Sequence, residues 1–574
     1  MYSYLAPLRD MRFVIEEVLQ AGTDWKAMAR FADLDYDTAA QVLEEAARFA
    51  GDVLAPLNAQ GDREGCHWHD GQVSTPAGFA DAYRAFVTAG WPSLACDPVH
   101  GGQGLPLLVK TAFDEMLSAT NHAWMMYPGL LHGAYECLNA YGSDALKDRY
   151  LADLVSGRSL ATMNLTEPQA GSDLSLIRTR AEPADDDTWL VSGNKVFISG
   201  GAHDWTDNIL HLVLCRLPDA PAGSRGLSLV LAPKVLPDGR VNAIHCDGIE
   251  HKMGIKASAT CAMRFERATA WLVGAPHRGL AALFVMMNAA RLHVSLQGLG
   301  HLEMAQQNAQ RYACERIQGR GQAIGRHAAV RRIIWTQRAL CEGQRVLAYW
   351  TAHWLDQAQH HPLPDRREQA HQIVSVLTPV LKALLTDNGH RGADEALQVW
   401  GGYGYTRDCG IEQTVRDSRI AMIYEGTNEI QALDLIQRKV IEDSGSALRI
   451  VLAALEASLA AVRAVPQCHD LVRAYQQQRD ALQRCIDEMP VRIQNDPGWS
   501  VRIADDFLRA LGLTLLGWAW LRISEVSHGH EGDPWYDAKR ASARFGLEWL
   551  LGEATWRWQR VMAPATALPE LPPG

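Results

Sequence analysis

A short region of strand-like sequence, about residues 160–275, lies between two longer regions that show helical periodicity. Before it, apolar residues recur at helical spacing, for example over 37–55 and 75–89, and after it they recur in long runs such as 280–316. The middle region instead contains short alternating or apolar stretches separated by turn residues. This order predicts a mainly α-helical protein with an inserted β domain.

The length of 574 residues is too great for one compact core. The changes in pattern predict an N-terminal helical domain with an N-terminal extension, a β domain, a C-terminal four-helix-bundle domain and an additional helical domain. Their expected ranges are, in that order, 1–160, 161–278, 279–440 and 441–574. We expect the tryptophans of the last domain to pack against the bundle: Trp518, Trp520, Trp549, Trp556 and Trp558.

Composition and charge narrow the class of protein. Hydrophobic residues make up 47 % of the chain and charged residues 21 %, which is typical of globular proteins. The formal net charge of −11 argues against a general nucleic-acid-binding surface. The 11 cysteines include no Cys-x-x-Cys pair, which favours reduced thiols, and the apolar run 513–521 is too short to cross a bilayer. We therefore expect a cytoplasmic protein without a nucleic-acid partner or a membrane span.

Three stretches invite a metal or phosphate interpretation that we do not favour. Residues 66–69 and 528–530 contain histidine pairs, but neither has a complete ligand set, so we interpret them as surface loops and expect no metal. The glycine-rich stretch 101–104 follows no predicted strand and precedes no lysine. A turn is the better interpretation of this stretch.

The segment 422–431 has the clearest chemical meaning. Glu425 precedes Gly426 and then Thr427, a residue suited to capping the helix that follows. A helix start offers free N–H groups and the positive end of the dipole. A carboxylate there suits a base beside a bound carbonyl, and the N–H groups suit an anionic cofactor. Taken alone, the segment could equally be an ordinary loop that enters an ordinary helix.

Other segments carry residues suited to a ligand. Gly171 and Ser172, in a turn, can offer backbone N–H groups to an anion. The guanidinium of Arg316 can pair with a diphosphate in two-pronged geometry. The adjacent Gly401 and Gly402 allow the backbone to approach a ligand closely. Each also has a plain structural interpretation, as a turn, an exposed helix end or a connection between helices.

Together, the order of domains and these segments resemble the acyl-CoA dehydrogenase family over about residues 40–440. The added C-terminal domain and the stretch 286–292 resemble a longer bacterial subgroup around 3-methylthiopropanoyl-CoA and similar short or medium acyl-CoAs. The resemblance implies an FAD-dependent oxidoreductase of lipid metabolism and β-oxidation. Its expected reaction is the α,β-dehydrogenation of an acyl-CoA thioester to the 2,3-enoyl-CoA.

The resemblance also implies roles for single residues. Glu425 matches the catalytic base, because the other position that relatives use for a base is Ala290 here. The residues that match FAD contacts are Met163, Leu165, Thr166, Gly171, Ser172, Phe197, Ile198, Ser199, Arg316, Gln398, Gly401, Gly402, Thr427 and Glu429. Those that match substrate contacts are Ser172, Arg291, Tyr424 and Gly426. Phe197 stands where many relatives carry tryptophan.

Partners are implied in the same way. The expected electron acceptor is electron-transfer flavoprotein. In the family, the residues that match Arg316 and 398–402 reach the FAD of a second subunit, which implies at least a homodimer. We expect the extra domain to cover the surface that shorter relatives use to form tetramers. Two alternatives stay open: an acyl-CoA oxidase, which passes its electrons to oxygen, and a DNA-associated flavoprotein relative, against which the net charge argues.

Overall fold

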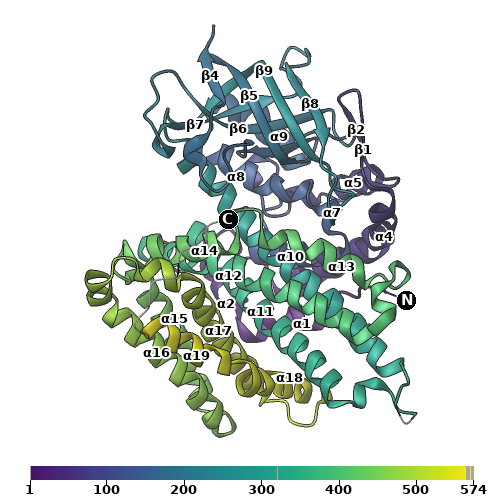
Figure 1. Cartoon of the computed structure of the whole chain (residues 1–574), viewed down its shortest axis with the longest axis vertical. Helices are drawn as coiled ribbons and strands as arrows, with labels where there is room; N and C mark the ends of the chain where they lie inside the picture. The colour runs from purple at the N-terminus through teal and green to yellow at the C-terminus, as the bar shows by residue number, and fades with distance from the viewer. Residues whose placement is uncertain (1, 186, 320, 564–568, 570–574) are drawn as a thin grey trace. The chain divides into compact units, whose positions relative to one another are not determined.

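A computed structural model describes residues 2–185, 187–319, 321–563 and 569. The chain forms two compact units (Figure 1). The helical unit comprises Met1–Glu44, Leu107–Glu115 and Val294–Gly574, and the mixed unit comprises Glu45–Pro106 and Met116–His293. Helices that run through both units are α3 (Tyr36–Arg48), α6 (Leu107–Thr120) and α10 (Gly279–Glu315).

The helical unit otherwise contains α1 (Leu8–Arg12), α2 (Ala21–Ala27), α11 (Ala328–His360), α12 (Pro364–Trp400), α13 (Ile411–Ser418), α14 (Asn428–Leu433), α15 (Ser446–Arg463), α16 (His469–Asn495), α17 (Trp499–Ser527), α18 (Pro534–Phe545) and α19 (Gly552–Met562). The helices of the mixed unit are α4 (Ala55–Glu64), α5 (Phe79–Thr88), α7 (His122–Met125), α8 (Leu131–Tyr141) and α9 (Asp144–Ser156). Its strands are β1 (His67–His69), β2 (Gln72–Ser74), β3 (Ser159–Asn164), β4 (Arg180–Pro183), β5 (Thr188–Ser199), β6 (Asn208–Arg216), β7 (Leu227–Pro233), β8 (Ile244–Ile249) and β9 (Thr260–Val273).

The seven strands β3–β9 form one sheet in the order β3-β6-β4-β5-β9-β7, with β8 paired to β9. Because β7 also pairs with β6, the strand pairing returns on itself. The strands β6 and β7 are buried along almost their whole length, which explains why their sequences are continuous apolar runs. The order helical, β, helical, helical is therefore confirmed.

Two details of the β region differ from the sequence prediction. The Ser-Gly-Asn stretch within residues 189–199 has the composition of a turn between two strands, but these residues belong to the single strand β5, which stays paired with β9 along its length. Two irregularities in the pairing, at Val191/Ser192 and Lys195/Ile198, accommodate the residues that resemble a turn. In addition, His67 and His69 are not in a loop, because they form the short strand β1.

Two glycines set the distance between α10 and α12. A Cβ on Gly298 would lie 2.4 Å from the carbonyl oxygen of Leu385, and a Cβ on Gly389 would lie 2.3 Å from the carbonyl oxygen of Gly298. Neither position has room for a side chain, so the two backbones approach each other directly. This crossing fixes α12, which continues to Trp400.

Trp520 of α17 joins the additional helices to the bundle. The side chain is fully buried, and its Nε1 donates a hydrogen bond of 2.8 Å to the carbonyl oxygen of Ala339 in α11. A Cβ on Gly343 would lie 2.7 Å from this nitrogen, and a Cβ on Gly546 would lie 2.4 Å from the indole ring. The indole therefore occupies a slot between two glycines that a larger residue would close.

The prediction that all five tryptophans pack inside is wrong for two of them. Trp518, Trp520 and Trp558 are buried, but Trp549 is 64 % exposed and Trp556 is 41 % exposed. The reason is a break in the helical structure between Pro534 and Met562. A π-helical segment, Gly546–Leu550, separates α18 from α19 and changes which residues face the bundle.

One described helix, α10, is long and apolar enough to cross a membrane by length and composition, and the bent pair 428–441 with 446–463 passes the same test jointly. The apolar stretch of α10 is 56 % buried inside the fold. We interpret α10 as a core helix of the bundle, since such helices share this composition.

A buried ion cluster links α6, α10 and α11. Arg345 donates from Nη2 to Glu115 Oε1 and to Glu303 Oε2, each at 2.6 Å. The hydroxyl of Tyr349 donates to Glu115 Oε2 at 2.7 Å. Burial raises the pKa of Glu115, and the neighbouring guanidinium opposes that rise. One arginine thus compensates two buried carboxylates.

Replacing Arg345 with methionine should lower the free energy of unfolding by about 3–5 kcal/mol, because two buried carboxylates lose their partner. Chemical denaturation measures this change. The control is Arg463→Met, which removes an exposed ion pair with Glu456 and should cost at most about 1 kcal/mol. Equal effects of the two substitutions would show that the buried cluster has no special role.

Candidate cofactor and substrate site

The predicted site residues fall in both units, and several of those in the mixed unit lie at or near the ends of β3 and β5. The end of β3 and the residues directly after it carry Met163, Leu165 and Thr166. The carbonyl oxygen of Thr166 accepts a hydrogen bond of 2.9 Å from Val196 N, which ties this loop to β5. Further along, a Cβ on Gly171 would have no heavy atom within 4 Å, and Ser172 is exposed. The loop therefore presents open backbone, which suits an anionic group.

A buried ion pair that the sequence did not reveal holds this loop. Lys195 Nζ donates to Glu167 Oε1 at 2.9 Å and to the carbonyl oxygen of Leu165 at 3.0 Å, and its side chain is fully buried. The carboxylate of Glu167 also accepts from the backbone N–H groups of Arg178 and Thr179. Burial alone would raise the pKa of Glu167, but Lys195 and the donated hydrogen bonds lower it to about 2.

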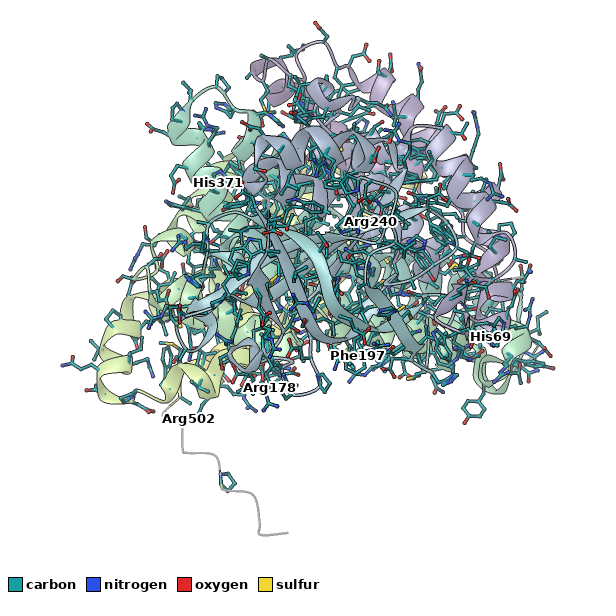
Figure 2. The ribbon with its side chains drawn as sticks, turned by 90° about the horizontal axis from the view of Figure 1, so that it is seen from above. His69, Arg178, Phe197, Arg240, His371 and Arg502 are labelled. Atoms are coloured by element: carbon teal, nitrogen blue, oxygen red, sulfur yellow. The ribbon has the colours of Figure 1, made fainter. Side chains whose placement is uncertain are left out.

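Phe197 lies at the irregularity in β5 and points to solvent. Its φ is 61°, in the left-handed region, and its side chain is 61 % exposed (Figure 2). The pairs on either side of it, Lys195 with Met263 and Ile198 with Cys261, hold this strained conformation in place. Ile198 is buried and Ser199 pairs with Thr260, so the two neighbours of the exposed ring are anchored in the sheet.

Arg291 is the remaining predicted residue of the mixed unit. It lies in α10, is only 5 % exposed, and makes polar interactions within the fold.

In the helical unit, the structure places Arg316 beside the segment Gly401–Tyr405. The guanidinium carbon of Arg316 lies 5.3 Å from the centre of the Tyr403 ring. Gly401 has a φ of 60°, and a Cβ on Gly401 or Gly402 would have no heavy atom within 4 Å. Gln398 is exposed in the last turn of α12. Open glycine backbone next to a guanidinium fits one end of a dinucleotide cofactor.

The segment that carries Glu425 is a strained turn into a helix. Glu425 has a φ of 58° and Gly426 a φ of 83°, and α14 starts directly after Thr427. Thr427 Oγ1 accepts a hydrogen bond of 3.4 Å from Ile430 N, so the predicted cap is confirmed. A hydrogen bond from Thr427 lowers the pKa of Glu429. Left-handed backbone at a glutamate is uncommon and persists only where neighbours enforce it.

The enforcing residues, Lys382 and Gln431, were not identified from the sequence. Lys382 Nζ donates to the carbonyl oxygen of Gly426 at 2.8 Å and to Asn428 Oδ1 at 3.0 Å. Gln431 Nε2 donates to the carbonyl oxygen of Glu425 at 3.0 Å. Both side chains are fully buried. The only sequence signal for Lys382 is a lysine in an otherwise apolar run of α12.

Tyr424 is tied to α10. Its hydroxyl donates to Gln297 Oε1 at 2.5 Å, and burial, followed by the nearby Glu425, raises the pKa of Tyr424 well above its usual value. The phenol therefore stays neutral and anchors the residue that precedes Glu425.

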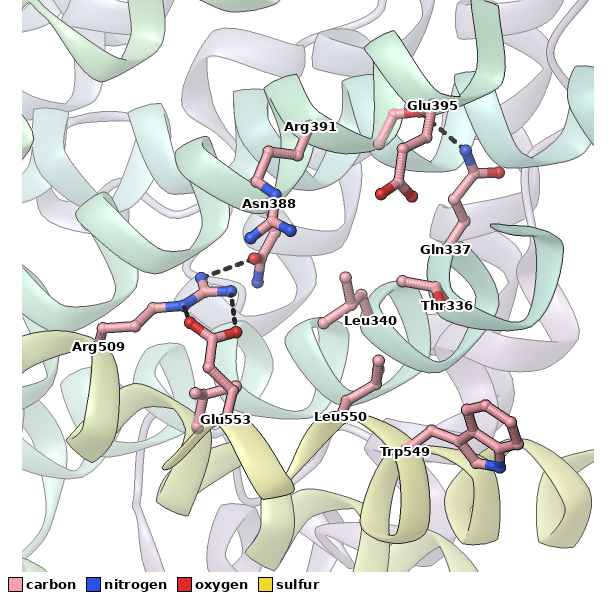
Figure 3. Close-up of a pocket in the computed structure, with 12 residues that line it drawn as sticks. Thr336, Gln337, Leu340, Asn388, Arg391, Glu395, Arg509, Trp549, Leu550 and Glu553 are labelled. Carbon is pink, nitrogen blue, oxygen red and sulfur yellow. Dashed lines mark hydrogen bonds and ion pairs between the residues drawn. The ribbon is translucent and has the colours of Figure 1, made fainter. Parts of the chain in front are cut away.

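A separate pocket of about 120 Å³ lies between the bundle and the additional helices (Figure 3). Arg509 spans it, with a hydrogen bond of 2.7 Å to Asn388 Oδ1 and paired contacts to Glu553. Arg391 and Glu395 also line it. None of the predicted site residues lines this pocket, and its acidic and basic groups are balanced.

Glu167→Gln should destabilise the protein by about 3 kcal/mol at pH 7, because a pKa lowered from 4.5 to about 2 corresponds to about that free energy. The folded-state pKa is the lower one. The difference in free energy of unfolding between the wild type and Glu167→Gln is therefore largest above about pH 5 and decreases as the pH falls toward 2. Unfolding free energies at pH 7 and 3.5 measure this; for Glu182→Gln, at a half-exposed carboxylate, we expect at most about 1 kcal/mol at either pH. A pH-independent difference would contradict the assignment.

Lys382→Met should loosen the turn at Glu425, because the carbonyl of Gly426 loses its buried donor. An unsatisfied buried acceptor costs about 1–3 kcal/mol, so amide hydrogen exchange over 426–431 should accelerate by roughly 5–150-fold. Lys26→Met, at an exposed lysine, should leave this exchange unchanged. Unaltered exchange in Lys382→Met would mean that the turn is held by other contacts.

Within the part of the chain that the structure describes, no group of three or more histidine, cysteine, aspartate or glutamate side chains could hold a metal ion.

Four protein-family models match this chain, each over a different region. The matching models are the N-terminal domain of acyl-CoA dehydrogenase at residues 37–158, the middle domain at 162–268 and the C-terminal domain at 277–441. A fourth, described as acetyl-CoA dehydrogenase C-terminal like, matches 447–572.

Individual relatives agree with these matches. The chain is 39 % identical to 3-methylmercaptopropionyl-CoA dehydrogenase of Ruegeria pomeroyi, over 97 % of this chain and 98 % of that protein. It is 30 % identical to a butyryl-CoA dehydrogenase of Syntrophomonas wolfei, over 95 % of this chain and 94 % of that protein. Its fold matches an acyl-CoA dehydrogenase of Bacillus anthracis, solved with FAD, with a TM-score of 0.73 at 19 % identity over 94 % of this chain and 90 % of the other.

Proposed function

Because this chain belongs to the acyl-CoA dehydrogenase family and is thus an FAD-dependent oxidoreductase, we propose that Glu425 is the base of its α,β-dehydrogenation of acyl-CoA. The observation that carries this proposal is the turn at Glu425. A carboxylate stands on left-handed backbone, and two buried side chains hold the carbonyl groups of Glu425 and Gly426 from inside the bundle. Such a turn presents a side chain in one fixed direction, which general-base catalysis requires.

The residues present fit FAD. Open backbone at Gly171 can donate to the pyrophosphate, and Met163 at the end of β3 and Leu165 and Thr166 directly after it precede this glycine in the chain. The strand end Phe197–Ser199 would lie against the flavin ring, while Thr427 and Glu429 would contact the cofactor at the start of α14. Arg316, Gln398, Gly401 and Gly402 would hold the FAD of a second subunit. When bound, FAD supplies the acceptor for the hydrogen that leaves C3 of the acyl chain with its electron pair.

The protein supplies the proton chemistry. Glu425 takes the proton from C2 of the thioester, and the electron pair of that C–H bond forms the new C2–C3 double bond. Its backbone N–H donates to the thioester carbonyl, where negative charge develops. The acyl chain displaces water from the carboxylate, which strengthens Glu425 as a base. Ala290, at the other position that relatives use for a base, can accept no proton.

Ser172, Arg291, Tyr424 and Gly426 complete the proposed substrate contacts. We propose a short or medium acyl-CoA as the substrate, including the 3-methylthiopropanoyl thioester, in line with the names of the relatives from Ruegeria pomeroyi and Syntrophomonas wolfei.

We also propose electron-transfer flavoprotein as the electron acceptor and a homodimer as the working form, because Arg316 and Gly401–Gly402 match contacts that cross subunits in the family. From the family's reaction we propose a place in β-oxidation. A cytoplasmic location fits the eleven free cysteines.

Glu425→Gln should reduce turnover of a short acyl-CoA by at least about 10²–10⁴-fold, since the amide cannot take the proton. A dye-linked assay under anaerobic conditions measures turnover, and the FAD content of the variant should stay at the wild-type value. The control is Glu442→Gln, an exposed carboxylate outside the proposed site, which should keep wild-type rates.

Near-normal turnover of Glu425→Gln would overturn the assignment of the base. The same assay distinguishes the electron acceptor, because a dehydrogenase should release little hydrogen peroxide in air, whereas an oxidase would release it in proportion to turnover. A panel of straight, branched and methylthio acyl-CoAs then ranks the substrates.

A further inference from the structure

The segment Tyr2–Leu5 lies along α10 and is held by two amide side chains of that helix. Ser3 N donates to Asn308 Oδ1 at 2.9 Å, and Asn308 Nδ2 donates back to the carbonyl oxygen of Ser3 at 2.8 Å. Leu5 N donates to Gln307 Oε1 at 3.0 Å, and Gln307 Nε2 donates back to the carbonyl oxygen of Leu5 at 2.8 Å. Each amide thus satisfies the donor and the acceptor of one residue, as a neighbouring strand would.

The side chains of this segment alternate in the way that extended backbone dictates. Ser3 and Leu5 face solvent, and Leu5 is 75 % exposed. Tyr2 and Tyr4 face the helices, and Tyr4 is only 9 % exposed. The register is therefore defined, because a slip by one residue would expose both tyrosines.

Tyr2 packs at the point where α12 ends and α13 begins. Its hydroxyl is 2.6 Å from Thr414 Oγ1 in α13, and its ring contacts the ring of Trp400 edge-on, with centroids 6.4 Å apart. Gly410 has a φ of 80°, which favours glycine, and a Cβ there would lie 3.0 Å from the Tyr2 ring, a tight contact that would require the ring to shift. Trp400 in turn stacks on Tyr312 of α10 at 4.2 Å.

These contacts bracket the glycine-rich segment that is proposed to meet FAD. Trp400 directly precedes Gly401 and Gly402, and Gly410 directly precedes α13. Tyr2 touches both ends of this connection. Fixing the ends of a glycine-rich segment removes conformational freedom that a ligand would otherwise have to remove on binding.

We propose that the segment Tyr2–Leu5 positions Gly401–Tyr405 for the cofactor, and that Tyr2 is the residue through which this segment sets the affinity for FAD. This inference rests on the proposed function, because it takes the FAD contacts at Gly401 and Gly402 from it. Tyr2 is a positioning residue, since it acts through Trp400 and Thr414 and not on the cofactor itself.

The test compares full-length Tyr2→Ala, Tyr2→Phe and Leu5→Ala with the wild type. Each protein is stripped of flavin, its thermal midpoint is measured without FAD, and its Kd for FAD is measured by titration. Tyr2→Ala should bind FAD about 5–150-fold more weakly, the range of a typical coupling between sites. Tyr2→Phe, which keeps the ring and loses the bond to Thr414, should fall between Tyr2→Ala and the wild type. Leu5→Ala keeps the backbone contacts and should bind like the wild type.

Turnover provides a second readout. At saturating FAD, Tyr2→Ala should recover wild-type kcat and KM for the acyl-CoA, since neither Glu425 nor the substrate residues touch Tyr2. A loss that FAD does not restore would indicate general misfolding and would overturn the inference. So would a Kd for FAD equal to that of the wild type in both Tyr2 variants.

Where Tyr2→Ala does not accumulate as folded protein, Tyr2→Phe and Asn308→Ala take its place. Asn308→Ala removes both hydrogen bonds between the Asn308 side chain and the backbone of Ser3. Wild-type FAD affinity in both proteins would contradict the proposal. A wild-type protein that binds no FAD would refute the proposed function instead, which keeps the two failures distinct.

Discussion

The turn that carries Glu425 depends on one buried ammonium group. Lys382 is fully buried in α12, where a charge without partners would cost several kcal/mol. Its partners are the carbonyl oxygen of Gly426 and the side chain of Asn428, both in an irregular segment. The lysine and the segment therefore stabilise each other, since neither is satisfied alone. The close crossing of α10 and α12 at Gly298 and Gly389 fixes the helix from which Lys382 extends.

The mixed unit uses the same arrangement. Lys195 is equally buried, and it holds the loop after β3 through Glu167 and the carbonyl oxygen of Leu165. In each unit, a lysine inside regular structure binds the backbone of a loop that carries proposed site residues. This arrangement combines open backbone at Gly171, Gly401 and Gly402 with a fixed course of the chain. Such preorganisation is what binding and catalysis require of loop residues.

The sequence predicted the features that depend on residues close together in the chain. The long helical periods gave the helices of the bundle, and Thr427 caps α14 as its position before the helix indicated. Features that depend on distant neighbours were missed. The Ser-Gly-Asn stretch resembles a turn, yet β9 keeps it within one strand. Trp549 and Trp556 read as core residues, but the π-helical segment Gly546–Leu550 turns them outward. The roles of Lys195 and Lys382 could not be predicted, because a lysine in an apolar stretch of sequence does not indicate which group it will bind.

The central claim is that Glu425 removes the C2 proton in the step that reduces the flavin. Rapid mixing of the FAD-loaded protein with butanoyl-CoA in the absence of oxygen, followed by the visible absorbance of the flavin, tests it most directly. The wild type should bleach in a single turnover, and deuterium at C2 should slow the bleaching. Glu425→Gln should bind the thioester without bleaching. Bleaching of Glu425→Gln at the wild-type rate would contradict the account.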